Sequence, residues 1–331
     1  MEPVRVASVG LGWWGGTLAD KATVAGIEVA SCYARTPEAR EEFAASHGCA
    51  PTATLEEVLS DDSIDAVIIA TPHSTHADLV VEAAQAGKHV FVDKPFTLTV
   101  AEAKRAIAAA DEAGVVLQVG HNRRRQPANR RLKEMVDGGE LGMIHYAEAN
   151  LSYPKGLNPR TGWRGDPAES PAGGMAGLGV HMADNLIYLL GRPARVAAFS
   201  KQVIGVGTLD DVTVATLEFE SGPLGILATA MVIPDIARTA LWGTETAAWN
   251  EGDGEHFYVQ KVGEKERTEL EVETLDTVVD ELAEFAENVR AGSRPETGGP
   301  EALEVVAVFE GLVESAATGT VVDLDEVRAR E

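Results

Sequence analysis

The chain has 331 residues, of which 45% are hydrophobic and 24% are charged. At about 150 residues per domain, this length predicts two domains. The composition is typical of a soluble globular protein and excludes a disordered or fibrous chain. The formal net charge of −24 repels phosphate backbones and anionic lipids, which disfavours nucleic acid as a partner. The longest apolar stretch, near residues 224–233, is interrupted by Gly225 and is too short for a membrane span. We therefore expect no nucleic-acid and no membrane partner.

The N-terminus and the cysteines bear on cellular location. Met-Glu-Pro leads directly into an apolar strand pattern, without the basic and apolar segments of a signal peptide. Two cysteines, Cys32 and Cys49, are too few for a disulfide framework or a four-cysteine zinc site. These features predict a cytoplasmic protein without a structural metal.

The first third of the chain alternates short apolar runs with helix-like segments. The runs are nearly continuous, as expected for strands of a parallel sheet that helices cover on both faces. They occupy residues 4–9, 28–33, 65–70, 89–92 and 115–119. This alternation of strand-like and helix-like segments predicts a doubly wound α/β domain over residues 1–121.

A different pattern begins at residue 122. Segments such as 211–220 and 223–233 read as strands of an antiparallel sheet, with few helices between them. Two amphipathic helices, at about 276–290 and 300–318, complete this part. The pattern predicts a second, α+β domain over residues 122–331 with a largely antiparallel open sheet.

A glycine motif follows the first expected strand and opens the first expected helix. It reads Gly10-Leu11-Gly12-Trp13-Trp14-Gly15. Glycines at this spacing also occur by chance or in structural turns, but in this context they allow a tight turn and the approach of a pyrophosphate to a helix N-terminus. The first domain is therefore predicted to be a Rossmann dinucleotide-binding domain that uses these six residues.

The second expected strand ends in Tyr33-Ala34-Arg35-Thr36, without the carboxylate that binds the ribose hydroxyls of NAD. Arg35 and the Thr36 hydroxyl are suited to the additional phosphate of NADP. We therefore expect NADP(H) to be the preferred cofactor, with NAD(H) as the alternative. The alternative is that Arg35 is an ordinary solvated arginine.

The next two strands end in Ala70-Thr71-Pro72-His73-Ser-Thr-His76 and in Asp93-Lys94-Pro95. With the glycine motif and Ala86-Gly87-Lys88-His89-Val90, these segments resemble the glucose-fructose oxidoreductase / inositol dehydrogenase / MocA (Gfo/Idh/MocA) family, in which the more frequent form is Glu-Lys-Pro. The resemblance continues through Gly120–Arg124, Trp163-Arg164, the glycine-rich lead into His181 and Arg290–Pro295, and so covers almost the whole chain.

The resemblance implies that Lys94 is the catalytic lysine, beside the nicotinamide and the substrate hydroxyl. Partial desolvation there would lower the pKa of the lysine and suit it to proton transfer, whereas outside this motif a solvated lysine would be expected. The H-x-x-H spacing of two histidines resembles a metal site, but without a third ligand it favours cofactor contact or helix capping. The further predicted cofactor contacts are Thr71, Pro72, His73, His76, Asp93, Asn122, Trp163 and Arg164.

In its second domain, the family carries Gly-Gly-x-x-x-Asp-x-Gly-x-His at the start of a helix. His181 matches the family histidine, but Gly177 stands where the family has aspartate. One interpretation is that the aspartate is dispensable for this substrate. The other is that Asp184 or Tyr153 performs part of its role. Arg123, Tyr153, Trp163 and His181 join Lys94 as predicted substrate-binding residues. Arg123–Arg125 and Arg130–Arg131 alternatively form a solvated helix face.

The resemblance implies an NAD(P)-dependent oxidoreductase. It would transfer a hydride between nicotinamide and a carbinol carbon of a sugar, sugar acid, cyclitol or dihydrodiol, with Lys94 and His181 moving the proton. One alternative is a glycoside-cleaving enzyme that oxidises its substrate transiently with a retained NAD. Another alternative is a non-catalytic protein that senses dinucleotides. The absence of the family aspartate at Gly177 leaves this alternative open. By the same resemblance we expect a homodimer or homotetramer.

Overall fold

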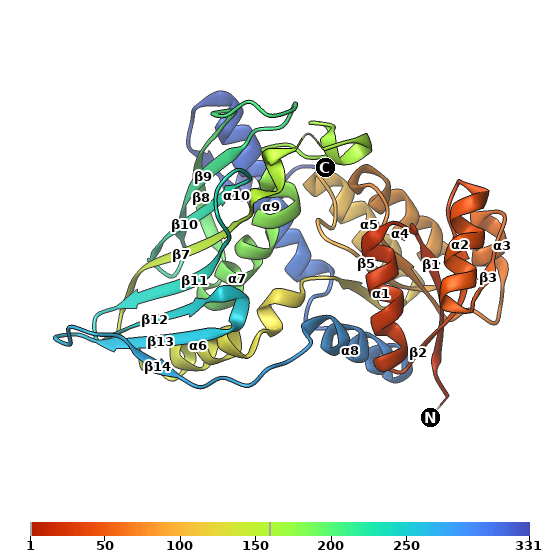
Figure 1. The fold of residues 1–331 in the computed structure, drawn as a ribbon, viewed down its shortest axis with the longest axis horizontal. Helices are drawn as coiled ribbons and strands as arrows, with labels where there is room; N and C mark the ends of the chain where they lie inside the picture. Colours follow the sequence, from red (N-terminus) through yellow and green to blue (C-terminus); the bar gives the residue numbers. More distant parts are fainter. Residues whose placement is uncertain (1, 159) are drawn as a thin grey trace. The chain divides into compact units, whose positions relative to one another are not determined.

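The computed structural model describes residues 2–158 and 160–331, which divide into two compact units (Figure 1). The first unit contains the chain up to residue 122 and residues 276–303. The second contains residues 123–275 and 304–331. A parallel sheet flanked by helices in the first unit and a largely antiparallel sheet in the second confirm the predicted combination of a Rossmann domain and an α+β domain.

The first unit is built on a six-stranded parallel sheet in the order β3-β2-β1-β4-β5-β6. Its strands are β1 Val4–Val9, β2 Ile27–Tyr33, β3 Ala50–Pro51, β4 Ala66–Ile69, β5 His89–Val92 and β6 Leu117–Val119. The direction of chain winding reverses between β1 and β4. In such sheets ligands bind at this reversal, beyond the carboxyl ends of the strands, and the predicted cofactor residues follow β1, β2, β4 and β5.

Local sequence signals set the ends of several helices in this unit. Thr54 and Thr99 form capping boxes with Glu57 and Glu102, and Gly114 ends a helix in the left-handed conformation. The helices are α1 Trp13–Val24, α2 Pro37–His47, α3 Leu55–Ser60, α4 His76–Gln85, α5 Val100–Ala113 and α8 Thr277–Ala291, with the short helix η1 His73–Thr75. The sheet and these helices together position the loops that carry the cofactor motifs.

Helix α8 lies within the first unit, although it follows the residues of the second in sequence. Its apolar residues Leu282 and Phe285 belong to the core that contains Leu18 and Phe91, and the two phenylalanine rings meet edge to face at 5.7 Å. The Gln118 side chain also donates to a carbonyl of this helix, at 2.8 Å. This arrangement differs from the predicted continuous second domain, because a helix pattern does not show which core the apolar face joins.

The second unit is built on a nine-stranded mixed sheet in the order β14-β13-β12-β11-β7-β10-β9-β8-β15. All neighbouring pairs of this sheet run antiparallel except β7 and β10. The strands are β7 Ile144–Ser152, β8 Pro193–Lys201, β9 Val212–Phe219, β10 Leu224–Ala230, β11 Ile236–Gly243, β12 Thr246–Glu251, β13 His256–Lys261, β14 Thr268–Leu270 and β15 Val322–Asp323. Buried and more exposed residues alternate along β9 and β10, as expected when a sheet buries one face.

Helix α7, Val180–Leu190, packs against β7 of the second unit and carries the predicted catalytic histidine, His181, in its first turn. A π-helical segment, η5 Met175–Gly179, leads into it. The other helices are α6 Pro127–Asp137, α10 Leu324–Arg328 and the short η2 Asn122–Arg125, η3 Pro154–Leu157, η4 Gly162–Gly165 and η6 Gly252–Gly254; α9, Gly299–Thr318, begins in the first unit and ends in the second. No helix in the described ranges is long and apolar enough to cross a membrane.

Candidate active site

The three glycines of the turn after β1 meet different steric demands. Gly10 adopts φ +93°, and a Cβ there would lie 2.5 Å from the Ala70 carbonyl oxygen. A Cβ at Gly15 would lie 2.1 Å from the Gly10 carbonyl oxygen, whereas one at Gly12 would meet no atom within 4 Å. Gly10 and Gly15 are therefore required by the packing of the turn itself, and Gly12 faces open space.

The N-terminus of α1 fits an anionic ligand. Its N-cap, Gly12, offers no side-chain hydrogen bond, and the first turn holds no acidic residue. The first N–H groups of a helix lack partners within the helix and carry partial positive charge. The indole of Trp13 is 74% exposed beside this end, with its ring 5.5 Å from that of Trp14. These residues fit the pyrophosphate of a dinucleotide.

Arg35 and Thr36 form the turn between β2 and α2. Both are exposed, and Thr36 is the N-cap of α2 without a side-chain capping bond. Arg40, by contrast, donates to the Ala34 carbonyl oxygen at 2.8 Å and holds the turn. Within residues 2–158 and 160–331, Arg35 has neither a hydrogen bond nor an ion pair. Its guanidinium is therefore available to a ligand.

His76 joins the loops that follow β4 and β5. The side chain is completely buried; Nδ1 lies 2.9 Å from the Pro95 carbonyl oxygen and Nε2 lies 3.1 Å from that of Thr71. Burial lowers the pKa of His76, and the charge of Asp93 opposes this effect. The ring thus holds together the two loops that carry the predicted cofactor and catalytic residues. Its own contact with the cofactor stays a prediction.

Asp93 and Lys94 follow β5 at the carboxyl edge of the sheet. The Asp93 N–H donates to the Ile69 carbonyl at 2.9 Å, which fixes the loop to β4. Burial raises the pKa of Asp93, while the charges of Lys94 and His76 and the indole N–H of Trp14 oppose the rise. The buried Asp93 carboxylate therefore lies near enough to Lys94 and His76 for their charges to act on it.

The remaining cofactor candidates of the first unit already have contacts within the protein. Asn122 donates to the Thr277 hydroxyl of α8 at 2.8 Å, and the Thr71 hydroxyl lies 2.7 Å from that of Thr75. His73 is 9% exposed, with its ring 6.0 Å from that of His76. Their roles toward a cofactor stay predictions. Among the described residues, no group of three His, Cys, Asp or Glu side chains could hold a metal ion.

In the second unit, the structure places His181 in the first turn of α7, where it is 7% exposed. Gly177 lies one turn earlier, within the π-helical segment η5. A Cβ at Gly177 would meet no atom within 4 Å, so the missing side chain leaves space. π-Helical turns within α-helices are frequent at functional sites.

Asp184, one turn after His181, is bound by Arg124. The guanidinium of Arg124 donates twice to this carboxylate, at 2.9 Å from Nε and 2.5 Å from Nη2, and the two side chains are only 5% and 1% exposed. The alternative that Arg124 and Arg125 are solvated is wrong: both residues are 4% exposed. The periodicity of a short segment did not show that Asp184, 60 positions away, would pair with Arg124.

Arg123 and Tyr153 lie together, as two predicted substrate residues. The Arg123 guanidinium donates to the Tyr153 hydroxyl at 3.3 Å and forms an ion pair with Asp253. Burial lowers the pKa of Arg123, and Tyr153 opposes this effect. Sequence reasoning missed Asp253, since no motif surrounds it and its partner lies 130 positions earlier.

Trp163 and Arg164 lie in the short helix η4. The Arg164 guanidinium stacks on the Trp163 ring, 4.2 Å from its centroid. Arg164 is exposed and Trp163 is half-buried. The stack fixes a positive charge at this surface, and its predicted contact with cofactor or substrate stays a prediction.

Comparisons with known proteins agree with this arrangement. Residues 4–121 match the model of an oxidoreductase family with an NAD-binding Rossmann fold (GFO_IDH_MocA), and residues 129–248 match the GFO/IDH/MocA C-terminal domain. The chain is 33% identical to scyllo-inositol 2-dehydrogenase (NAD⁺) from Bacillus subtilis, over 82% of this chain and 81% of the relative. It is 30% identical to D-xylose 1-dehydrogenase (NADP⁺) 2 from Haloferax volcanii, over 89% and 92%.

Solved structures agree as well. A putative NADPH-dependent oxidoreductase from Desulfitobacterium hafniense superposes with a TM-score of 0.94 at 31% identity, covering 99% of this chain and 100% of the other. The glycine turn, the Lys94 loop and the His181 helix lie within the matched residues. This chain belongs to the Gfo/Idh/MocA family of NAD(P)-dependent oxidoreductases.

Proposed function

We propose that the protein transfers a hydride between a nicotinamide cofactor and the secondary carbinol or carbonyl carbon of a sugar, sugar derivative, cyclitol or dihydrodiol. The observation that carries the proposal is the turn at Gly12, which leaves the uncapped N-terminus of α1 open, while Lys94 follows β5, which is separated from β1 by β4 alone in the same sheet. The names of the inositol and xylose dehydrogenases to which the chain is similar support polyhydroxylated substrates.

In this proposal, the residues of the two units have separate tasks. The N–H groups at the start of α1 hold the pyrophosphate, and bound nicotinamide accepts or supplies the hydride. During oxidation, the neutral Lys94 amine would accept the proton of the reacting hydroxyl as the hydride leaves its carbon, and the resulting Lys94 ammonium would return that proton during reduction; the His181 imidazole would hydrogen-bond the same hydroxyl. Arg123 and Tyr153 orient the other hydroxyl groups of the substrate.

NADP(H) is the proposed preferred cofactor. The exposed Arg35 guanidinium has no intramolecular partner in the described part of the chain, and the Thr36 hydroxyl lies in the same turn. Both groups can donate to a 2′-phosphate, and no carboxylate stands at the end of β2 to repel it. Relatives with either cofactor in their names exist, so this choice rests on Arg35.

A substrate screen tests the proposed reaction. Aldoses, polyols, inositols and dihydrodiols are each incubated with NADP⁺ and with NAD⁺, and the reduced nicotinamide is followed by its absorbance. We expect substrate-dependent reduction, faster with NADP⁺. Cleavage of a glycoside by protein with retained cofactor and without net reduction would instead support the glycoside-cleaving alternative, and cofactor binding without turnover would support the sensor.

We also propose that the protein is a homodimer or homotetramer formed through the open face of the nine-stranded sheet. Phe199 and Val214 are cross-strand partners on this face and are 72% and 43% exposed, and Leu224 is 50% exposed. Apolar side chains clustered on one sheet face are typical of an interface. Light scattering tests this: a monomer whose mass is unchanged by Phe199→Glu would contradict it.

A cytoplasmic location belongs to the same proposal. Cys32 and Cys49 are both free thiols in the structure, as expected in a reducing compartment. Fractionation of cells that produce the protein tests this location.

A further inference from the structure

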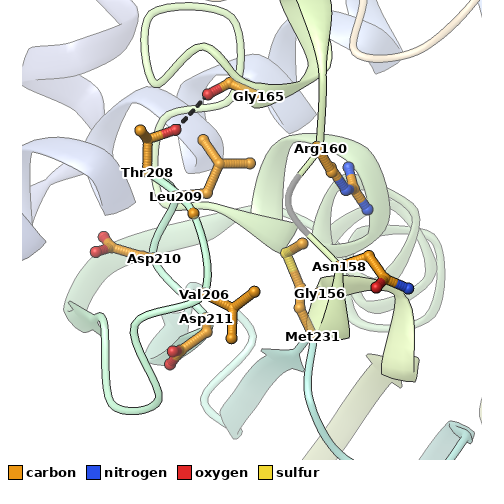
Figure 2. Close-up of a pocket in the computed structure, with 11 residues that line it drawn as sticks. Gly156, Asn158, Arg160, Gly165, Val206, Thr208, Leu209, Asp210, Asp211 and Met231 are labelled. Atoms are coloured by element: carbon orange, nitrogen blue, oxygen red, sulfur yellow. Dashed lines mark hydrogen bonds between the residues drawn. The ribbon is translucent and has the colours of Figure 1, made fainter.

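A narrow pocket lies between two loops of the second unit (Figure 2). The cavity volume is about 20 Å³, within a wider hollow of about 310 Å³ that includes open solvent. One wall is formed by Gly156, Asn158, Arg160 and Gly165, and the other by residues 206–211, with Met231 at the base. The pocket does not include any residue that the glycine turn or the Lys94 loop contributes.

Hydrogen bonds hold both walls in place. The Gly156 N–H donates to the Met231 carbonyl at 2.6 Å, and the Thr208 hydroxyl donates to the Gly165 carbonyl at 2.5 Å, the dashed line of Figure 2. A Cβ at Gly165 would lie 2.3 Å from the Arg160 carbonyl oxygen, so the chain folds back on itself at this point. Gly156 and Gly165, which precede and follow Arg160 in the sequence, are therefore both held by hydrogen bonds.

The two carboxylates of the pocket are engaged elsewhere. Asp211 accepts the N–H groups of residues 203, 204 and 205 at 2.7–2.9 Å. Burial alone would raise the pKa of Asp211, but these three donors outweigh it and the pKa is lowered. Asp210 accepts from the Ser200 hydroxyl at 2.6 Å. Figure 2 shows both carboxylates across the pocket from Arg160, so neither neutralises it.

Arg160 is half-buried and has no hydrogen bond or ion pair with any described residue. The chain has 52 acidic and only 28 basic residues, so arginines elsewhere find carboxylate partners. Arg195, for example, pairs with Glu218, and Arg267 pairs with Glu251. Burial and the nearby positive charge of Arg164 lower the pKa of Arg160. A partly desolvated guanidinium beside a like charge is unfavourable until an anion binds it.

We propose that Arg160, with the Asn158 amide beside it, is an anion subsite that receives the carboxylate or phosphate of an acidic sugar. The guanidinium presents a planar fork of N–H donors that matches either group, and the Asn158 amide adds a donor. The apolar side chains of Val206, Leu209 and Met231 reduce the access of water and strengthen the charged hydrogen bonds. This inference rests on the proposed function and narrows its substrates to anionic ones.

The test compares matched neutral and acidic sugars. D-glucose and D-galactose are assayed beside their uronates and their 6-phosphates, with both oxidised cofactors, using the wild-type protein, Arg160→Gln and Arg160→Lys. Arg105→Gln removes an exposed arginine of α5 that pairs with Asp78 and serves as the matched control. Calorimetric titration of D-glucuronate and D-glucose 6-phosphate into each protein, saturated with reduced cofactor, measures binding without turnover.

We expect kcat/KM for the best acidic sugar to exceed that of its neutral counterpart at least tenfold. Arg160→Gln should reduce this ratio about 10- to 100-fold, mainly through KM, as expected for loss of a charge-assisted hydrogen bond. Arg160→Lys should retain part of the preference, and Arg105→Gln all of it. A preference for uronates or for 6-phosphates identifies which anion the subsite receives.

The outcomes separate this inference from the proposed function. Dehydrogenation of a neutral sugar in preference to its acids, unaffected by Arg160→Gln, would overturn the subsite and leave the proposed reaction standing. If no compound is oxidised but acidic sugars bind and Arg160→Gln abolishes binding, the subsite stands and the reaction is wrong. Binding of acidic sugars that is equal in wild type and Arg160→Gln would overturn the subsite whatever the turnover.

Discussion

The glycine turn of the first unit and the His181 segment of the second are both helix starts rich in glycine, but their glycines differ. In the turn, a Cβ at Gly10 or Gly15 would collide with backbone, and Gly12 alone faces open space. In the segment before His181, Gly177 also faces open space, at the position where the resemblance leads one to expect a carboxylate. The open space at Gly12 thus lies at the helix N-terminus where we propose that the pyrophosphate binds, whereas the open space at Gly177 marks a side chain that is missing one turn before His181.

Of the changes that test this comparison, Gly12→Val has the largest expected effect, which is on cofactor affinity. The side chain enters open space without disturbing the turn, but it blocks a pyrophosphate from the N-terminus of α1. We expect no measurable binding of NADP(H) or NAD(H) by a protein with an unchanged circular dichroism spectrum. Gly10→Val is the contrasting variant, since its Cβ meets the Ala70 carbonyl and should lower the unfolding temperature. Undiminished cofactor affinity in folded Gly12→Val would make the turn purely structural.

Lys94→Met should lower kcat by about 10²- to 10⁴-fold, as is typical when a general acid or base is lost. His181→Asn should cost less, because Gly177 provides no carboxylate one turn away to orient the ring. The measurement is steady-state turnover of both variants on one substrate, with cofactor affinity determined by fluorescence titration. A greater loss in His181→Asn, or near-normal activity of Lys94→Met, would reverse this assignment of roles.

Asp184→Asn should destabilise the protein by about 3–5 kcal/mol, because it leaves the Arg124 guanidinium buried without its charged partner. Asp78→Asn removes one partner of the exposed pair with Arg105 and should cost less than about 1 kcal/mol. Urea-induced unfolding of both variants measures the difference. Equal stabilities would show that Asp184 is not primarily structural and would restore it as a candidate for the missing carboxylate near His181.

Arg35→Ala has the smallest expected effect of these changes. Loss of a charge-assisted contact with the 2′-phosphate should weaken NADP(H) binding by about 1.5–3 kcal/mol and leave NAD(H) binding nearly unchanged. Tryptophan or nicotinamide fluorescence titration with both cofactors measures this. If the unmodified protein binds NAD(H) as tightly as NADP(H), the preference assigned to Arg35 is wrong.

The parts of the molecule that sequence reasoning reached are those that short-range patterns determine. The strands Val4–Val9 and His89–Val92 agree residue for residue with the expected ones, because both faces of each are buried and their apolar runs are continuous. The bounds of helix α8 were predicted to within one residue. Its place in the core with Phe91 was not predicted, because an amphipathic pattern does not show which core the apolar face packs against.

The candidate site divides in the same way. The residues after β1, β4 and β5 are contiguous motifs at strand ends, so their spacing could be read directly. The pairs Arg124–Asp184 and Arg123–Asp253 join distant positions in the chain, and only the packing of α7 and η6 brings them together. Arg160 carries no motif; its significance lies in the lack of an ion pair with any described carboxylate, which a sequence with 52 acidic residues does not suggest.

The central claim is direct hydride transfer between a carbinol carbon and the nicotinamide. The most direct test uses the best substrate of the screen with deuterium at that carbon, incubated with oxidised cofactor, followed by mass spectrometry of the reduced cofactor. We expect one deuterium in the nicotinamide for each oxidised substrate molecule and slower turnover of the labelled substrate. Reduced cofactor without deuterium, or product formation with no reduced cofactor released, would contradict it.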